Sequence, residues 1–227
     1  MGFFWEGLPP YVIGWSRRIL GENVVAVETG TFRGDTSDLL AREFGSCVTI
    51  ERSAALAEKA RARFADDTAV TVLEGSSRDR LAEALPADEA PAFFWLDAHG
   101  VYDYVGPDTD ENPLLEELET ILSRRAKSPN VIAVDDARGM GTQPDWPPLN
   151  EVFAILDRYD YAGVIVDDAL IAAPKAGDPD FYALYKQSRM VEVSAVFHVW
   201  PNLKRVVAAR RWSDSAIVAA KKPLDRR

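Results

Sequence analysis

Two glycines and an acidic residue have the spacing of a nucleotide-cofactor site. The run Glu28-Thr29-Gly30-Thr31-Phe32-Arg33-Gly34 follows the apolar stretch 24–27 and precedes a segment that reads as a helix. Glycines let backbone amides approach a ligand closely, and the start of the helix adds a positive dipole end. Glu51 follows about twenty residues later, where an acid holds a ribose diol. A tight strand-to-helix turn without a ligand would also explain the glycines.

Three aspartates directly follow two further apolar segments. Asp97 comes after 92–96, and Asp135 and Asp136 come after 131–134. Carboxyl ends of neighbouring parallel strands converge, so these like charges would lie close together unless a cation compensates them. Carboxylate oxygens suit Mg²⁺. The three residues are therefore predicted metal ligands, and the open alternative is that they cap turns or bond backbone amides.

His99, two residues beyond Asp97, is the candidate general base, because a neutral imidazole takes up a proton near pH 7. A bond to the adjoining loop is the open alternative. His198, within the apolar run 196–200, reads as part of a packed strand. Two histidines and one cysteine exclude a thiolate or multi-histidine zinc site.

The elements that must position these residues alternate between strand and helix. Apolar strands are expected at 24–27, 47–50, 69–73, 92–96 and 131–134, with helices at 54–64, 80–85 and 113–127. The runs 163–166 and 169–173 are separated only by Asp167-Asp168, which indicates a hairpin. The pattern predicts an α/β fold, a doubly wound seven-stranded mostly parallel sheet with an antiparallel terminal hairpin.

A chain of 227 residues, 47% of them hydrophobic, suffices for one α/β domain with appendages. We expect an N-terminal aromatic arm at 1–22, a cofactor-binding domain at 23–175 and a C-terminal extension at 176–227. The arm would cover the cofactor or meet a second subunit, and the extension is the other candidate homo-oligomer contact. From Leu203 onward the extension is basic, so it is a solvated end, a dimer contact, or a contact for nucleic acid or acidic membrane.

Charge and hydropathy exclude several classes of partner. The net charge of -10 argues against nucleic acid, because phosphate binding needs a positive surface. The apolar runs are too short to span a bilayer, and Phe3-Phe4-Trp5 lacks the basic flank and apolar region of a signal peptide. The single Cys47 allows no internal disulfide, which leads us to expect a cytoplasmic protein.

A parallel sheet closed by an antiparallel hairpin differs from the fold of dinucleotide dehydrogenases. From about Val24 to Pro174 the chain resembles the seven-stranded class I S-adenosylmethionine-dependent methyltransferases. The motifs Asp97-Ala98-His99, Pro113-Leu114-Leu115-Glu116-Glu117-Leu118 and Val134-Asp135-Asp136 are similar to those of the metal-dependent, macrocin-type antibiotic-sugar O-methyltransferases and their cephalosporin-tailoring relatives.

The resemblance implies a role for each matching residue. The methionine moiety of the cofactor would lie among Glu28, Thr29, Gly30, Thr31 and Gly34. The ribose would lie on Glu51, and the adenine near Ser76 and Ser77. Magnesium would be held by Asp97, Asp135 and Asp136, which makes Asp97 a cofactor-side and catalytic residue as well. Relatives often carry an acid where this chain has His99.

The loops 99–112 and 138–148 are expected to bind the acceptor, through Tyr102, Tyr104, Arg138 and Trp146. Aromatic faces suit a sugar or an aromatic ring, although they equally suit packing against the scaffold. The predicted function is magnesium-dependent O-methylation of a small molecule. The alternatives are a nicotinamide-dependent oxidoreductase, which shares the glycine turn and ribose acid, and a non-catalytic S-adenosylmethionine-binding homologue.

Overall fold

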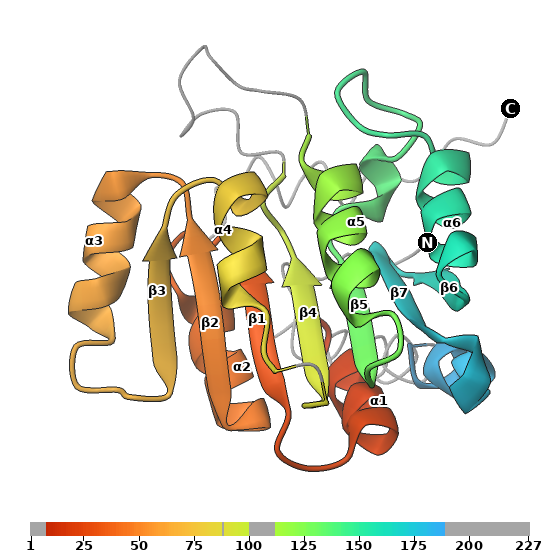
Figure 1. Cartoon of the computed structure of the whole chain (residues 1–227), viewed down its shortest axis with the longest axis horizontal. Coiled ribbons are helices and arrows are strands. Elements are labelled where there is room, and N and C mark those ends of the chain that lie inside the picture. The colour runs from red at the N-terminus through yellow and green to blue at the C-terminus, as the bar shows by residue number, and fades with distance from the viewer. Residues whose placement is uncertain (1–7, 88, 100–111, 189–227) are drawn as a thin grey trace, which may run out of the picture.

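A seven-stranded sheet forms the centre of the protein (Figure 1). The computed structural model describes residues 8–87, 89–99 and 112–188. The strand order is β3-β2-β1-β4-β5-β7-β6. The strands are β1 (Val25–Thr29), β2 (Ser46–Glu51), β3 (Val70–Glu74), β4 (Ala92–Leu96), β5 (Asn130–Val134), β6 (Tyr161–Val166) and β7 (Ala169–Pro174). The first five strands run parallel, and β7 is antiparallel to both β5 and β6.

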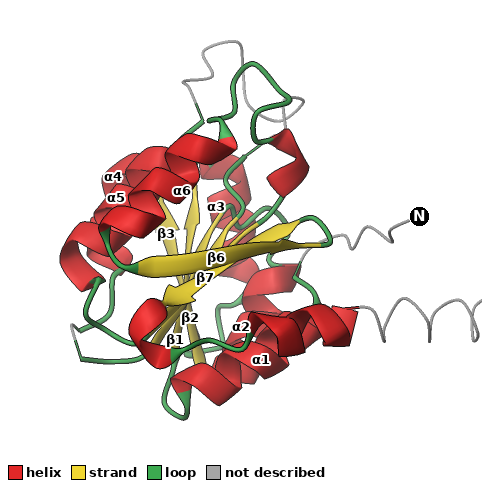
Figure 2. Cartoon of the chain, turned by 90° about the vertical axis from the view of Figure 1, so that its right-hand side faces the viewer, coloured by secondary structure: helices red, strands yellow, loops and turns green. Residues whose placement is uncertain are grey.

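Helices cover both faces of the sheet (Figure 2). One hydrophobic core lies under α1 (Pro10–Leu20) and α2 (Asp35–Phe44), and the other lies under α4 (Ser77–Ala84), α5 (Leu114–Arg125) and α6 (Leu149–Arg158). α3 (Ala54–Arg63) packs beside β3 at the edge of the sheet. The central strand β4 is apolar throughout because both of its faces are buried.

The predicted doubly wound sheet with its terminal hairpin is confirmed. The hairpin turn is Asp167-Asp168, and Asp167 takes the left-handed backbone conformation (φ 54°) that tight hairpin turns require. α4 begins three residues before the expected position, because the Ser76 hydroxyl accepts a hydrogen bond from the amide of Arg78 and caps the helix.

The predicted N-terminal arm is in part a core helix. Tyr11 and Trp15 of α1 are buried against the sheet. The indole of Trp15 donates to the carbonyl of Asp180 over 3.0 Å and stacks on Phe181, with 5.4 Å between ring centroids. Residues of α1 and Leu184, in the expected extension, thus belong to the same hydrophobic core.

Several expectations fall on residues outside the described structure. These are the aromatic residues Phe3-Phe4-Trp5, the loop residues Tyr102 and Tyr104, and the chain from residue 189 onward, which includes His198. Within the described ranges, no helix combines the length and the apolar character needed to cross a membrane.

Candidate functional site

Backbone hydrogen bonds gather the predicted site segments at the carboxyl edge of the sheet, the upper edge in Figure 1. The amide of Gly30 donates to the carbonyl of Ile50 over 2.9 Å, and the amide of Asp97 donates to the carbonyl of Thr29 over 2.9 Å. The amide of Asp135 donates to the carbonyl of Leu96 over 3.0 Å. The strand ends of β1, β2, β4 and β5 are thus bonded in a row.

The glycine turn between β1 and α2 lies against the end of β4. Gly30 has φ +88°, and a Cβ on it would lie 2.4 Å from the carbonyl oxygen of Asp97. Gly34 has φ +81°, and its Cβ would lie 2.8 Å from the ring of Phe64. Both positions require glycine, for backbone conformation and for space.

Glu28 is directed into the protein interior. Its carboxylate accepts hydrogen bonds from Ser37 Oγ and from Thr49 Oγ1, the latter over 2.6 Å. Burial raises the pKa of Glu28 to about 7. The hydroxyl of Thr31 bonds that of Thr49 over 2.6 Å, and Thr29 is fully buried. Glu28 and Thr31 therefore belong to an interior hydrogen-bond network with Thr49, whereas the buried hydroxyl of Thr29 has no hydrogen bond to a described residue.

Glu51 is fixed beside the glycine turn. Its Oε2 accepts the amide of Phe32 over 2.9 Å, and its Oε1 accepts the amide of Ser53 over 2.8 Å. Each carboxylate oxygen keeps acceptor capacity for one further hydrogen bond. Ser76 and Ser77 follow β3, the next strand along the edge, where Ser76 caps α4 and Ser77 is buried.

The aspartates form a crowded acidic group. Burial, and secondarily the negative charges of Asp135, Glu28 and Asp136, raise the pKa of Asp97 well above its usual range. Burial raises the pKa of Asp135 to about 6, although its Oδ1 accepts the amide of Asp136 over 2.8 Å. Bringing these carboxyl groups together is therefore costly while they are charged.

A fourth aspartate, Asp168, joins this group. One carboxylate oxygen from each of Asp135, Asp136 and Asp168 lies within 4.8 Å of the others. Asp97 is outside this set, although its carboxyl group interacts electrostatically with those of Asp135 and Asp136. Sequence analysis treated Asp168 only as a turn residue. The signal that would have found it is the antiparallel pairing of β7 with β5, which puts the hairpin turn at the carboxyl end of β5.

Arg138 lies within the acidic group rather than free above it. Its guanidinium contacts Asp136 Oδ1 over 2.6 Å and also forms an ion pair with Asp168. Its backbone amide donates to Asp168 Oδ1 over 3.0 Å. The carboxylate oxygens fit a hard divalent cation in number and type. Arg138 neutralises part of the same charge and would compete with such a cation.

His99 and Trp146 pack together under the surface. Their ring centroids lie 4.9 Å apart, and Trp146 sits on Gly139, where a Cβ would come within 2.7 Å of the indole. His99 Nε2 lies 3.6 Å from Glu117 Oε2, and neither of these two side chains is exposed. Trp146 is likewise buried, with 6% of its surface exposed.

Glu117 was missed by sequence analysis, although a signal was present. It stands on α5 between Leu114 and Leu118, at the helical spacing of the buried stripe. A carboxylate on the apolar face of a helix needs a partner, and the helix faces the end of β4 where His99 follows.

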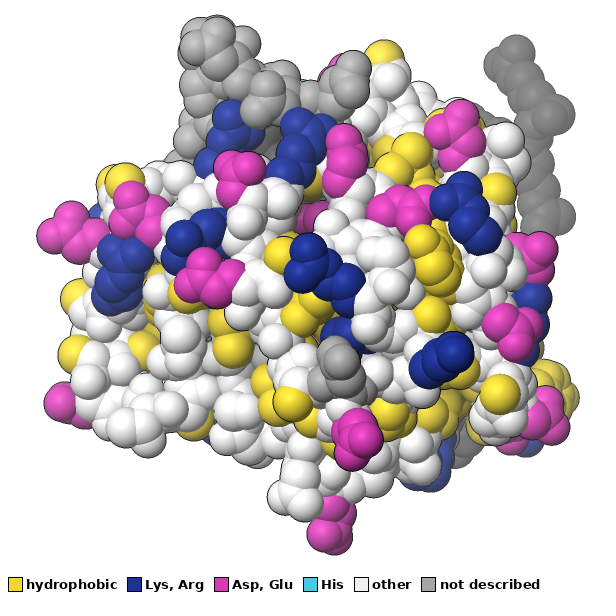
Figure 3. Space-filling view, in the orientation of Figure 1, with side chains coloured by type: hydrophobic (Ala, Val, Ile, Leu, Met, Phe, Trp, Pro, Cys, Tyr) yellow, Lys and Arg dark blue, Asp and Glu magenta, His cyan; other side chains and the backbone are white. Residues whose placement is uncertain are grey.

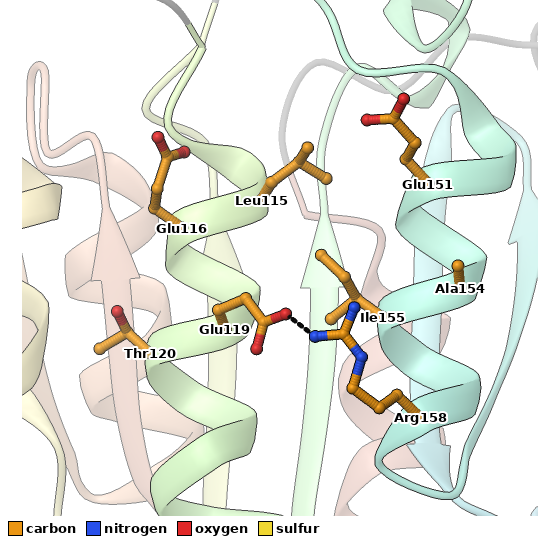
Figure 4. A pocket seen from close by; sticks show the side chains of 8 residues that line it. All are labelled: Leu115, Glu116, Glu119, Thr120, Glu151, Ala154, Ile155 and Arg158. Atoms are coloured by element: carbon orange, nitrogen blue, oxygen red, sulfur yellow. Dashed lines mark hydrogen bonds and ion pairs between the residues drawn. The ribbon is translucent and has the colours of Figure 1, made fainter.

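A groove of about 570 Å³ lies between α5 and α6 (Figure 4). Its walls are Leu115, Glu116, Glu119, Thr120, Glu151, Ala154, Ile155 and Arg158. The ion pair of Arg158 with Glu119 crosses it. Acidic and basic side chains are interspersed over this face of the molecule (Figure 3). None of the predicted site residues lines the groove.

Comparison with known proteins defines the fold. No protein-family model matches the chain, and no curated protein matches it in sequence. A Clostridium thermocellum structure named as an rRNA methylase superposes with a TM-score of 0.53 at 11% identity, over 72% of this chain and 94% of that one. A Streptococcus mutans structure named as a methyltransferase, in complex with SAH, gives a TM-score of 0.52 at 11% identity, over 74% and 99%. A Staphylococcus aureus structure named as a caffeoyl-CoA O-methyltransferase gives a TM-score of 0.50 at 14% identity, over 74% of this chain and 85% of that one. The chain has the Rossmann-like fold of the class I methyltransferases.

Proposed function

We propose that this protein is an S-adenosylmethionine-dependent methyltransferase that transfers a methyl group to a hydroxyl of a small molecule with the help of Mg²⁺. The observation that carries the proposal is the glycine turn at the end of β1, which lies against Asp97 and beside the fixed carboxylate of Glu51. Its sheet order and the fold it shares with methyltransferases support the same cofactor.

The residues at the carboxyl edge of the sheet suit S-adenosylmethionine. The cofactor carries a sulfonium and an ammonium, and the acids at this edge provide the complementary negative field. The remaining acceptor capacity of Glu51 suits the two ribose hydroxyls. Ser76 and Ser77, beyond Glu51 along the edge, would border the adenine.

Methyl transfer needs an acceptor oxygen that has lost its proton and is aimed along the C–S bond. Bound Mg²⁺ would supply Lewis acidity that lowers the pKa of the acceptor hydroxyl. Asp135, Asp136 and Asp168 lie close enough together to hold the ion, and Asp97, whose carboxyl group interacts with those of Asp135 and Asp136, would complete the predicted set. Asp97 also borders the glycine turn, so it stands between the proposed cofactor and acceptor positions. Arg138 would orient Asp136 and Asp168.

The nicotinamide alternative shares the glycine turn and Glu51 but not the rest of the edge. The antiparallel β7 between β5 and β6 replaces the parallel second half of a dinucleotide-binding sheet. The aspartate group has no task in hydride transfer. We therefore propose the methyltransferase function alone.

Two measurements test the proposal. Calorimetry with S-adenosylmethionine, its demethylated product, NAD⁺ and NADP⁺ should show binding of the first two ligands only. Binding of a nicotinamide cofactor alone would overturn the proposal.

With a panel of hydroxylated sugars and phenols as acceptors, Asp135→Asn should abolish formation of the demethylated product while cofactor affinity stays within about threefold of the parent. Excess chelator should have the same effect on the parent. Full turnover in chelator would exclude the metal from the mechanism.

A further inference from the structure

Glu117 and His99 form a buried polar pair without a hydrogen bond to any described residue. Neither oxygen of Glu117 and neither ring nitrogen of His99 has a hydrogen bond, and the side chains of both are fully buried. Glu117 lies among apolar residues of α5, namely Leu114, Leu118 and Ile121. A carboxyl group in such a place needs a hydrogen-bond partner, and the imidazole is the group that faces it.

The pair is one small movement from a hydrogen bond. The 3.6 Å between Nε2 and Oε2 exceeds the usual range of about 2.7–3.2 Å by less than an ångström. A slight rotation of either side chain closes that gap. Such bonds are commonly long in ligand-free sites and shorten when the ligand binds.

His99 connects the two segments that carry the aspartates. His99 follows Asp97 by two residues, and the backbone amide of Asp97 donates a hydrogen bond to the carbonyl of Thr29. On the other side the imidazole packs on Trp146, which belongs to the loop that follows Asp135 and Asp136.

We infer that Glu117 is a positioning residue that acts through His99: its hydrogen bond to Nε2 fixes the imidazole, and the fixed imidazole holds Asp97 and Asp135 in the arrangement that binds the divalent cation. This inference rests on the metal part of the proposed function. It makes His99 a link between α5 and the acidic group, and not the base that removes the acceptor proton.

The test compares Glu117→Leu and Glu117→Gln with Glu116→Gln as the matched control. Glu116 is the neighbouring residue of α5, is half exposed and contacts Arg78. The readout is the affinity for Mn²⁺, measured by electron paramagnetic resonance with saturating demethylated cofactor.

Loss of a residue that orients a metal ligand typically weakens metal binding 10- to 100-fold. Glu117→Leu should therefore bind Mn²⁺ at least about tenfold more weakly. Glu117→Gln, which keeps an acceptor for Nε2–H, should stay within about threefold of the parent. Glu116→Gln should match the parent, and all variants should keep the parent's affinity for the demethylated cofactor.

Two results would overturn the inference alone: Glu117→Leu with the parent's Mn²⁺ affinity, or Glu117→Gln as weak as Glu117→Leu. A parent that binds the demethylated cofactor but no Mn²⁺ would overturn the metal part of the proposed function together with this inference. A parent that binds neither would overturn the whole proposed function.

If Glu117→Leu does not fold, the double variant Glu117→Leu/His99→Leu removes both polar groups and leaves an apolar pair of similar volume. It should show the same loss of Mn²⁺ affinity, and an affinity equal to the parent's would overturn the inference. His99→Gln provides a second check, because glutamine can donate to Glu117 but cannot take up the acceptor proton. Positioning predicts turnover within about tenfold of the parent, and a loss of two or more orders of magnitude with intact Mn²⁺ binding would assign His99 as the base instead.

Discussion

Glu51 gives the most direct test of the cofactor site, because its carboxylate supports both the turn and the proposed ribose. Glu51→Ala removes two hydrogen bonds from the amides of Phe32 and Ser53 to a charged group. Each such bond contributes about 1.5–3 kcal/mol, so the free energy of unfolding should fall by about 3 kcal/mol. Loss of two further bonds to the ribose should weaken cofactor binding about a hundredfold.

The assay pairs calorimetric titration with the demethylated cofactor and chemical unfolding followed by circular dichroism. Glu43→Ala is the control, because Glu43 pairs with Arg17 on the surface, and such pairs contribute at most about 1 kcal/mol. Glu51→Gln, which keeps one acceptor oxygen, should fall between the parent and Glu51→Ala. A folded Glu51→Ala protein with unchanged cofactor affinity would remove Glu51 from the site, whatever its stability.

Two further predictions concern the same edge. Gly30→Ala and Gly45→Ala both place a side chain at a left-handed backbone position (φ +88° and +94°), which costs about 1–2 kcal/mol of stability. The two variants differ in space, because the new Cβ lies 2.4 Å from a backbone oxygen at Gly30 and has no described neighbour within 4 Å at Gly45. Gly30→Ala should therefore abolish cofactor binding in calorimetry while Gly45→Ala retains it, and equal affinities would contradict the close approach. The second concerns Glu28, whose pKa in the folded protein, about 7, lies above the ordinary glutamate value of 4.5 because of burial. The folded state binds the extra proton, so the free energy of unfolding should fall by about 3 kcal/mol as pH rises from about 4.5 through about 7, and Glu28→Gln should flatten that slope in urea unfolding. An unchanged slope in the variant would mean that other groups titrate.

Periodicity predicted most of the fold, and strand-end rules predicted which acidic residues lie together at one edge of the sheet. β4 and the hairpin were predicted because long apolar runs and a two-residue polar turn leave few alternatives. Asp97 and Asp135 were placed together because parallel strands end at a common edge. These inferences need only the backbone, which the order of apolar segments largely determines.

The remaining features depend on side-chain packing that no local pattern encodes. The carboxylate of Glu28 is bonded to Ser37 and Thr49, two residues that come from other elements of the fold. Trp146 packs against the backbone of Gly139 and against the ring of His99, and Gly139 leaves the space for this contact because it has no side chain. Arg138 turns back to Asp168 because the hairpin puts that carboxylate beside it.

The hairpin turn also determines when the acidic group can form during synthesis. β7 is inserted between β5 and β6, and its turn brings Asp168 to Asp136 and Arg138. Tyr11 of α1 donates a hydrogen bond to the neighbouring turn residue Asp167. An early helix of the described chain is thereby joined to a hairpin that is synthesised much later. While only the segments up to β5 have emerged from the ribosome, β5 is an open sheet edge and its aspartates lack Arg138 and Asp168. A nascent chain at that stage lacks Asp168, so the acidic group can assemble only after the hairpin has emerged.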